Sequence, residues 1–89
     1  MKAIHLLIKG KVQGVFYRAT AKKMAEHFGL TGWVKNTKEG NVETFATGNE
    51  EVLNEFINWC KQGPRNAKVS EVIVTPKTPE NFNGFSIVR

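Results

Sequence analysis

Hydrophobic residues change their spacing along the first third of the chain, and each spacing predicts one kind of element. The first predicted strand runs from Ala3 to Lys9. Within it, Ile4, Leu6 and Ile8 alternate with other residues and fall on one face. A helix is then predicted from about Arg18 to His27, and Gly29 follows it as a residue suited to end a helix. The residues that recur at helical spacing are Tyr17, Ala21, Met24, Ala25 and Phe28.

Two further strand-like segments follow, with a turn between them. They run from Thr31 to Lys35 and from Asn41 to Ala46. The stretch Asn36-Thr37-Lys38-Glu39-Gly40 has the composition of a turn, so the two segments are predicted to pair as a hairpin.

A second helix is predicted after this hairpin. Thr47-Gly48-Asn49-Glu50 has the Thr-x-x-Glu spacing of a capping box, which marks a helix start. Gly63-Pro64 marks its end, because glycine can turn left-handed and proline cannot continue a helix. Two more strands are predicted, from Lys68 to Thr75 and from Phe85 to Val88. The apolar stripe of this second helix comprises Val52, Leu53, Phe56, Ile57 and Cys60.

The order strand, helix, strand, strand, helix, strand predicts an α+β fold of the ferredoxin-like βαββαβ kind. We expect an antiparallel sheet of four strands plus a short C-terminal edge strand, with both helices on one face. In this topology the first two strands run parallel with the third between them. Their exits therefore lie at the same edge of the sheet, roughly 10 Å apart for strands spaced by ~4.8 Å. Arg18 and Asn36 follow those two exits and could converge on one ligand.

Composition limits the class of protein. The 89 residues allow one compact domain, so we expect residues 1–89 to form a single domain. No apolar run is long enough to span a membrane, and the start Met1-Lys2-Ala3 leads directly into a strand. A lone cysteine, Cys60, cannot form an internal disulfide. We therefore expect a cytoplasmic protein with no membrane partner.

Net charge indicates the kind of partner. Thirteen Lys and Arg against eight Asp and Glu give a formal charge of +5 at pH 7. Such a balance suits an anionic partner, either a phosphorylated small molecule or a nucleic acid. Several lysines also lie near the end of the first strand, although lysines of this kind commonly serve only solubility.

The segment Gln13-Gly14-Val15-Phe16-Tyr17-Arg18 joins a strand end to a helix start, and an anion suits this position. Backbone N–H groups there lack intrahelical partners, and the helix dipole adds partial positive charge. Gly14 lets the chain curl around an anion without a Cβ in the way. Arg18 is unfavourable for the dipole, and a bound phosphate would explain it. Taken alone, however, the Gly-x-x-x-Arg pattern favours a plain turn with a surface arginine.

Two motifs carry a resemblance that covers essentially the whole chain. The stretch Gly10-Lys11-Val12-Gln13-Gly14-Val15-Phe16-Tyr17-Arg18 resembles the first signature of the acylphosphatase family. Gly32-Trp33-Val34-Lys35-Asn36, followed by Gly40-Asn41-Val42-Glu43, resembles the second. Departures are small: Tyr17 stands where phenylalanine is more usual, family members vary at Phe16, and Glu39-Gly40 replaces an aspartate-glycine turn.

The resemblance implies a hydrolase that cleaves a carboxylic-phosphoric anhydride, an acyl phosphate, to a carboxylate and inorganic phosphate without metal or cofactor. It implies that Arg18 and backbone amides from about Gly14 to Arg18 bind the phosphoryl group, with Gln13, Gly14, Val15, Phe16 and Tyr17 counted among the substrate-binding residues. It also implies that Asn36 orients the attacking water. Alone, an asparagine at this point would be read as capping its own turn. The expected partner is a small-molecule acyl phosphate, and we expect a monomer.

Other functions find less support in the residues. An RNA-binding sheet of this fold needs aromatic residues on its central strands, but the first strand has none and the third offers only Phe45. A metal carrier of this fold would need a Cys-x-x-Cys pair, which is absent. A small-ligand regulatory domain stays open on the residues alone. His5, His27, Cys60 and Trp33 are interpreted as structural residues, because none has partners at metal-site or catalytic spacing.

Overall fold

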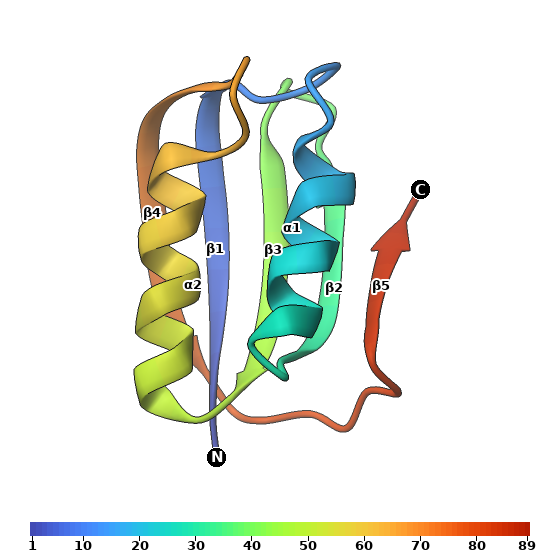
Figure 1. Ribbon diagram of the computed structural model, residues 1–89, viewed down its shortest axis with the longest axis vertical. Coiled ribbons are helices and arrows are strands. Elements are labelled where there is room, and N and C mark those ends of the chain that lie inside the picture. The colour runs from blue at the N-terminus through green and yellow to red at the C-terminus, as the bar shows by residue number, and fades with distance from the viewer.

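A computed structural model describes all residues from Met1 to Arg89 and contains two helices and one five-stranded sheet. Both helices cover the same face of the sheet, and the opposite face carries none (Figure 1). The elements in chain order are β1 (Lys2–Lys11), α1 (Tyr17–His27), β2 (Thr31–Asn36), β3 (Val42–Gly48), α2 (Glu50–Gln62), β4 (Lys68–Lys77) and β5 (Phe85–Val88).

The sheet has the strand order β4-β1-β3-β2-β5. β3 pairs antiparallel with both β1 and β2, and β1 pairs antiparallel with β4. The expected ferredoxin-like arrangement is therefore confirmed for the first four strands. β5 instead pairs parallel with β2, so the sheet is mixed rather than antiparallel throughout. The cause is the long connection from β4, which crosses the end of the sheet before β5 begins (Figure 1).

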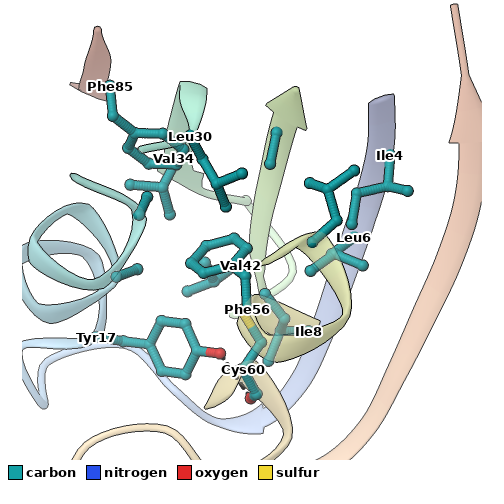
Figure 2. Packing of buried hydrophobic residues seen from close by; sticks show 14 of the residues in the cluster. Ile4, Leu6, Ile8, Tyr17, Leu30, Val34, Val42, Phe56, Cys60 and Phe85 are labelled. Carbon is teal, nitrogen blue, oxygen red and sulfur yellow. Dashed lines mark hydrogen bonds between the residues drawn. The ribbon is translucent and has the colours of Figure 1, made fainter. Parts of the chain in front are cut away.

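The core lies between the sheet and the two helices. α1 packs against β2 and β5, whereas α2 packs against β4, β1 and β3. The alternating residues Ile4, Leu6 and Ile8 of β1 are buried under α2, as their spacing predicts. The apolar stripes of both helices face the same cluster, in which Phe56 is central (Figure 2). Neither helix is long and apolar enough to cross a membrane.

The predicted capping box at the start of α2 is wrong. β3 continues to Gly48, and Thr47 is a buried strand residue that pairs with Ala3 and Thr31. Asn49 caps the helix instead, because its side-chain oxygen accepts a hydrogen bond of 2.8 Å from the Glu51 N–H. The Thr-x-x-Glu spacing failed because sheet pairing on both sides of β3 outweighs one local capping bond.

The strand exits meet as the topology predicts. The connection from β1 to α1 and the turn from β2 to β3 emerge at the same end of the sheet (Figure 1). Residues at these two exits line a common cavity, which is described next.

Candidate active site

A cavity of about 310 Å³ lies where α1 begins beside the ends of β2 and β5. Arg18 and Asn36 both line it, although eighteen positions separate them in the sequence. The remaining lining residues are Val12, Gly14, Phe16, Tyr17, Ala19, Ile87 and Arg89. The cavity therefore brings together the two side chains that the sequence singles out.

The backbone before α1 presents a run of free donors to this end of the molecule. None of the N–H groups of residues 13–19 donates a hydrogen bond to another protein group. The helix has no side-chain cap and no acidic residue in its first turn. Free N–H groups and the helix dipole both favour an anion here.

The curvature of this loop depends on two residues with positive φ. Gly14 has φ +74°, and an added Cβ there would meet no other atom within 4 Å. Phe16, at the N-cap, has φ 63° and ψ 23° and is the only non-glycine residue with positive φ. A bulky residue in the left-handed region is strained, and such strain commonly occurs at functional sites. Its side chain is 80% exposed, so packing of the ring does not account for the conformation.

Tyr17 anchors the loop to the rest of the core. Its ring is 2% exposed, and its hydroxyl donates a 2.7 Å hydrogen bond to the carbonyl oxygen of Cys60 at the end of α2 (Figure 2). Burial raises the pKa of Tyr17, and the contact with Cys60 adds to the effect. The phenol therefore stays neutral and serves as a donor to α2. Its ring lines the cavity, but its hydroxyl is committed elsewhere.

Asn36 is the last residue of β2, and its amide has no protein partner. Its Oδ1 atom is buried without a hydrogen bond, and its nitrogen donates to no protein acceptor. A buried polar atom left unpaired is uncommon in folded proteins and calls for an explanation. The alternative interpretation, in which the Asn36 side chain caps its own turn, is wrong, because Oδ1 accepts no hydrogen bond from the turn. The amide is free to bind a ligand or water in the cavity.

Gln13 was expected among the substrate-binding residues, but its side chain lies outside the cavity. Its side-chain nitrogen donates to the carbonyl oxygens of Thr37 and Asn41, at 2.8 and 2.7 Å. These two residues close the turn that follows Asn36, and Thr37 N–H also donates to Asn41. The Gln13 side chain thus ties the loop before α1 to the hairpin that carries Asn36.

The side chain of Val15 also lies outside the cavity. It packs against the hydrophobic core, so only its backbone N–H is available at the loop. Of the residues expected to bind substrate, Gly14, Phe16, Tyr17 and Arg18 line the cavity. Gln13 and Val15 do not line it: the Gln13 side chain bonds to the hairpin, and the Val15 side chain packs against the core.

Four residues of the cavity were not among the predicted site residues: Val12 and Ala19, which adjoin the predicted loop in sequence, and Ile87 and Arg89, which lie far from it. β5 pairs parallel with β2, with Lys35 opposite Val88, which brings Arg89 beside Asn36. The parallel pairing of the last strand was not foreseen, so nothing in the sequence connected Arg89 with the site. The one available signal was the alternation of Phe85, Ile87 and Arg89 on a common face.

The cavity is positively charged and carries no compensating acid. No Asp or Glu lines it, and neither Arg18 nor Arg89 forms an ion pair with any carboxylate. Two guanidinium groups and a run of free amides make an environment suited to a phosphorylated ligand.

The residues interpreted as structural have structural partners. His5 hydrogen-bonds Glu43 at 2.9 Å on the helix-free face of the sheet. Burial alone would raise the pKa of Glu43, but hydrogen bonds from His5 and Lys35 and their charges hold it below its usual value. Burial raises the pKa of the Cys60 thiol to about 12, which leaves it a poor nucleophile. Trp33 stacks on Phe45 at 6.3 Å between ring centres, and His27 makes an edge contact with Phe28.

The helix-free face gives little support to an RNA-binding function. Phe45, the one aromatic residue on the central strands β1 and β3, is 5% exposed and lies against Phe82 at 5.5 Å between ring centres. A ring covered in this way cannot stack on a base.

The fold and the cavity together define a ferredoxin-like domain with unpaired donors and two arginine side chains around a cavity at the start of its first helix. Comparisons with known proteins give the family. The sequence model of the acylphosphatase family matches residues 4–87. An acylphosphatase from Methylococcus capsulatus is 42% identical over 100% of this chain and 98% of its own, and one from Marinobacter nauticus is 50% identical over 91% and 89%.

A solved structure agrees with these relatives. The crystal structure of acylphosphatase from Bacillus subtilis matches with a TM-score of 0.97 and 37% identity over the full length of both chains. The chain therefore belongs to the acylphosphatase family, and it is an enzyme that hydrolyses acyl phosphates.

Proposed function

We propose that hydrolysis proceeds by attack of a water held by Asn36 on a phosphoryl group bound by Arg18 and the amides before α1. The observation that carries the proposal is the meeting of three unpaired groups at one cavity. These are the N–H groups of residues 13–19, the Arg18 guanidinium and the Asn36 amide. Each lacks a protein partner, so each is available to the reactants.

The phosphoryl group binds where positive charge is concentrated. The free amides and the bidentate guanidinium of Arg18 hold its oxygens, and the same donors stabilise the charge that these oxygens carry in the transition state. Phosphoryl transfer through a loose transition state depends mostly on such positioning and charge stabilisation. A preformed loop, held by Tyr17 and Gln13, needs little reorganisation during the reaction.

Asn36 orients the nucleophile. Its amide holds a water beside the phosphorus, and the water oxygen forms the new P–O bond while the bond from phosphorus to the acyl oxygen breaks. The leaving group departs as a carboxylate, which is stable without protonation, so no general acid is required. The proton lost by the water passes to a phosphoryl oxygen of the substrate. Holding the reactants in this geometry can supply several kcal/mol of the barrier.

The reaction is proposed to need no metal or cofactor, because the arginine and the amides supply the positive charge. The test is hydrolysis of benzoyl phosphate in the presence of excess chelator. We expect undiminished turnover and competitive inhibition by inorganic phosphate. Loss of turnover with chelator and recovery with a divalent cation would contradict the proposal. So would a pH profile of kcat that requires an enzyme base.

Arg18, Asn36 and the loop before α1 meet at one cavity within a single copy of the chain. We propose on this ground that residues 1–89 act as a single-domain monomer. Sedimentation at several protein concentrations tests this, with activity proportional to protein concentration as the expected companion result. A dimer that loses activity on dilution would contradict it.

A further inference from the structure

Arg89 is a second cation in the cavity, and the proposed phosphoryl site gives it no task. It lines the same space as Arg18 and pairs with no carboxylate. Two guanidinium groups that line one cavity repel each other, and an anionic ligand between them would offset this repulsion. A single phosphoryl group is already served by Arg18 and the amides of residues 13–19.

The position of Arg89 separates it from those amides. It follows β5, which forms the outer edge of the sheet, and it stands beside Asn36 at the end of β2. The buried Phe85 and the partly buried Ile87 of the same strand face α1, so Arg89 continues that face toward the cavity. The loop before α1 instead enters from β1, on the other side of β3 and β2.

The cavity has room for more than a phosphoryl group. Its volume of about 310 Å³ is at the small end of the range for pockets that bind whole small molecules. Its lining also includes Ile87 and the exposed residue Phe16, whose side chains are suited to the carbon atoms of an acyl group. Arg89 borders the same space as these two residues.

We propose that Arg89 binds an anionic group on the acyl part of the substrate, so that the enzyme prefers acyl phosphates carrying a second negative charge. This inference rests on the proposed function, since it assumes that the phosphoryl group occupies the start of α1. Arg89 is then a specificity residue: it holds a carboxylate or second phosphate of the acyl group and takes no part in the bond exchange.

The test compares benzoyl phosphate with 3-carboxybenzoyl and 4-carboxybenzoyl phosphate. These substrates have leaving groups of similar reactivity and differ mainly in the extra charge. A charged hydrogen bond contributes about 1.5–3 kcal/mol, so kcat/KM for the better carboxylated substrate should exceed that for benzoyl phosphate by about ten- to a hundredfold. Arg89→Gln should bring this ratio close to one, and Arg89→Lys should retain part of it.

Arg65→Gln is the matched control, because it removes the same charge from an exposed residue outside the cavity. It should leave the substrate ratio at the wild-type value. Urea unfolding of each variant confirms that the fold is intact.

The outcomes separate the two proposals. Equal kcat/KM on all substrates in the wild type would overturn the role of Arg89 and leave benzoyl phosphate hydrolysis standing. If Arg89→Gln weakens inhibition by inorganic phosphate as much as it lowers kcat/KM on every substrate, Arg89 belongs to the phosphoryl site and the inference is wrong. Absence of hydrolysis of any acyl phosphate would instead overturn the proposed function itself.

Discussion

The two helices of this protein begin in opposite ways. α2 is capped by the Asn49 side chain, which accepts from the Glu51 N–H, and the acids Glu50 and Glu51 in its first turn interact favourably with its dipole. α1 has no side-chain cap and no acid in its first turn, and it has Arg18 there instead. The start of α2 therefore has stabilising groups that the start of α1 lacks, and this difference is consistent with the anion site proposed at α1.

Each helix start also borders a cavity, and the larger one is not the candidate site. The cavity beside the start of α2 has a volume of about 470 Å³ and is lined by Asn49 and Glu51, together with Met1, Phe28, Gly29, Gly48 and Val52. Its only charged side chain is that of an acid, Glu51. The smaller cavity at α1 has two arginines and no acid. Unpaired donors and charge, rather than volume, distinguish the site.

Among the variants that test this comparison, removal of the Arg18 side chain should change activity the most. Arg18→Ala takes away the charged, bidentate ligand of the phosphoryl group and should lower kcat/KM for benzoyl phosphate by about a thousandfold or more. Inorganic phosphate should bind correspondingly more weakly. The control is Lys23→Ala, which removes one exposed positive charge from the same helix. Arg18→Ala with near-normal kcat/KM would mean that the phosphoryl group binds elsewhere.

Asn36→Ala should have the next largest effect and should act differently. Loss of water placement worth ~3–5 kcal/mol lowers kcat by roughly two to four orders of magnitude. The inhibition constant for phosphate should change little, because Arg18 and the amides are intact. Equal losses in phosphate binding and kcat would assign Asn36 to phosphate binding instead. Steady-state kinetics with phosphate as inhibitor measures both quantities.

Gln13→Leu should loosen the connection between the two parts of the site. Without the bonds to Thr37 and Asn41, the loop before α1 and the hairpin of Asn36 no longer hold a fixed separation. We expect kcat to fall by about ten- to a hundredfold, with phosphate inhibition close to normal. Gln62→Leu, at an exposed position at the end of α2, is the control. A loss of stability without a change in kcat would contradict this positioning role.

Ala19→Glu should make the start of α1 resemble that of α2. A carboxylate in the first turn interacts well with the dipole but repels the phosphoryl group, so stability and activity should move in opposite directions. We expect the free energy of unfolding to rise by about 0.3–1 kcal/mol and the phosphate inhibition constant to rise about three- to tenfold. Ala19→Gln separates charge from size. An unchanged inhibition constant in Ala19→Glu would place the bound phosphate away from this turn.

Asn49→Ala should have the smallest effect on activity, and it tests the start of α2, the other helix start in this comparison. It removes the cap of α2 and should lower the free energy of unfolding by about 1 kcal/mol, measured by urea denaturation. Activity on benzoyl phosphate should stay at the wild-type level, since Asn49 borders the other cavity. A fall in kcat in the folded variant would show that the two helix starts are coupled.

Local patterns predicted most elements, and they also singled out Arg18 and Asn36, the two side chains that meet at the candidate site. Residues with alternating or helical spacing gave every strand and helix within a few positions, and helix α1 begins one residue before the predicted start. Predictions failed where distant pairing outweighs a local signal. Thr47 has the spacing of a helix cap, but it belongs to β3, which is paired with a strand on each side. Gln13 was expected among the substrate-binding residues, but its side chain bonds to the hairpin instead.

The sequence by itself determined the order of the elements, the bare start of α1 and the placement of Arg18 and Asn36 at neighbouring strand exits. These depend on periodicity and on residues close together in the chain. Only the tertiary structure decided that β5 lies parallel to β2, that Arg89 therefore enters the cavity, and that Gln13 bridges loop and hairpin. Such contacts join residues far apart in sequence, and their free energies depend on packing that no short stretch of sequence encodes.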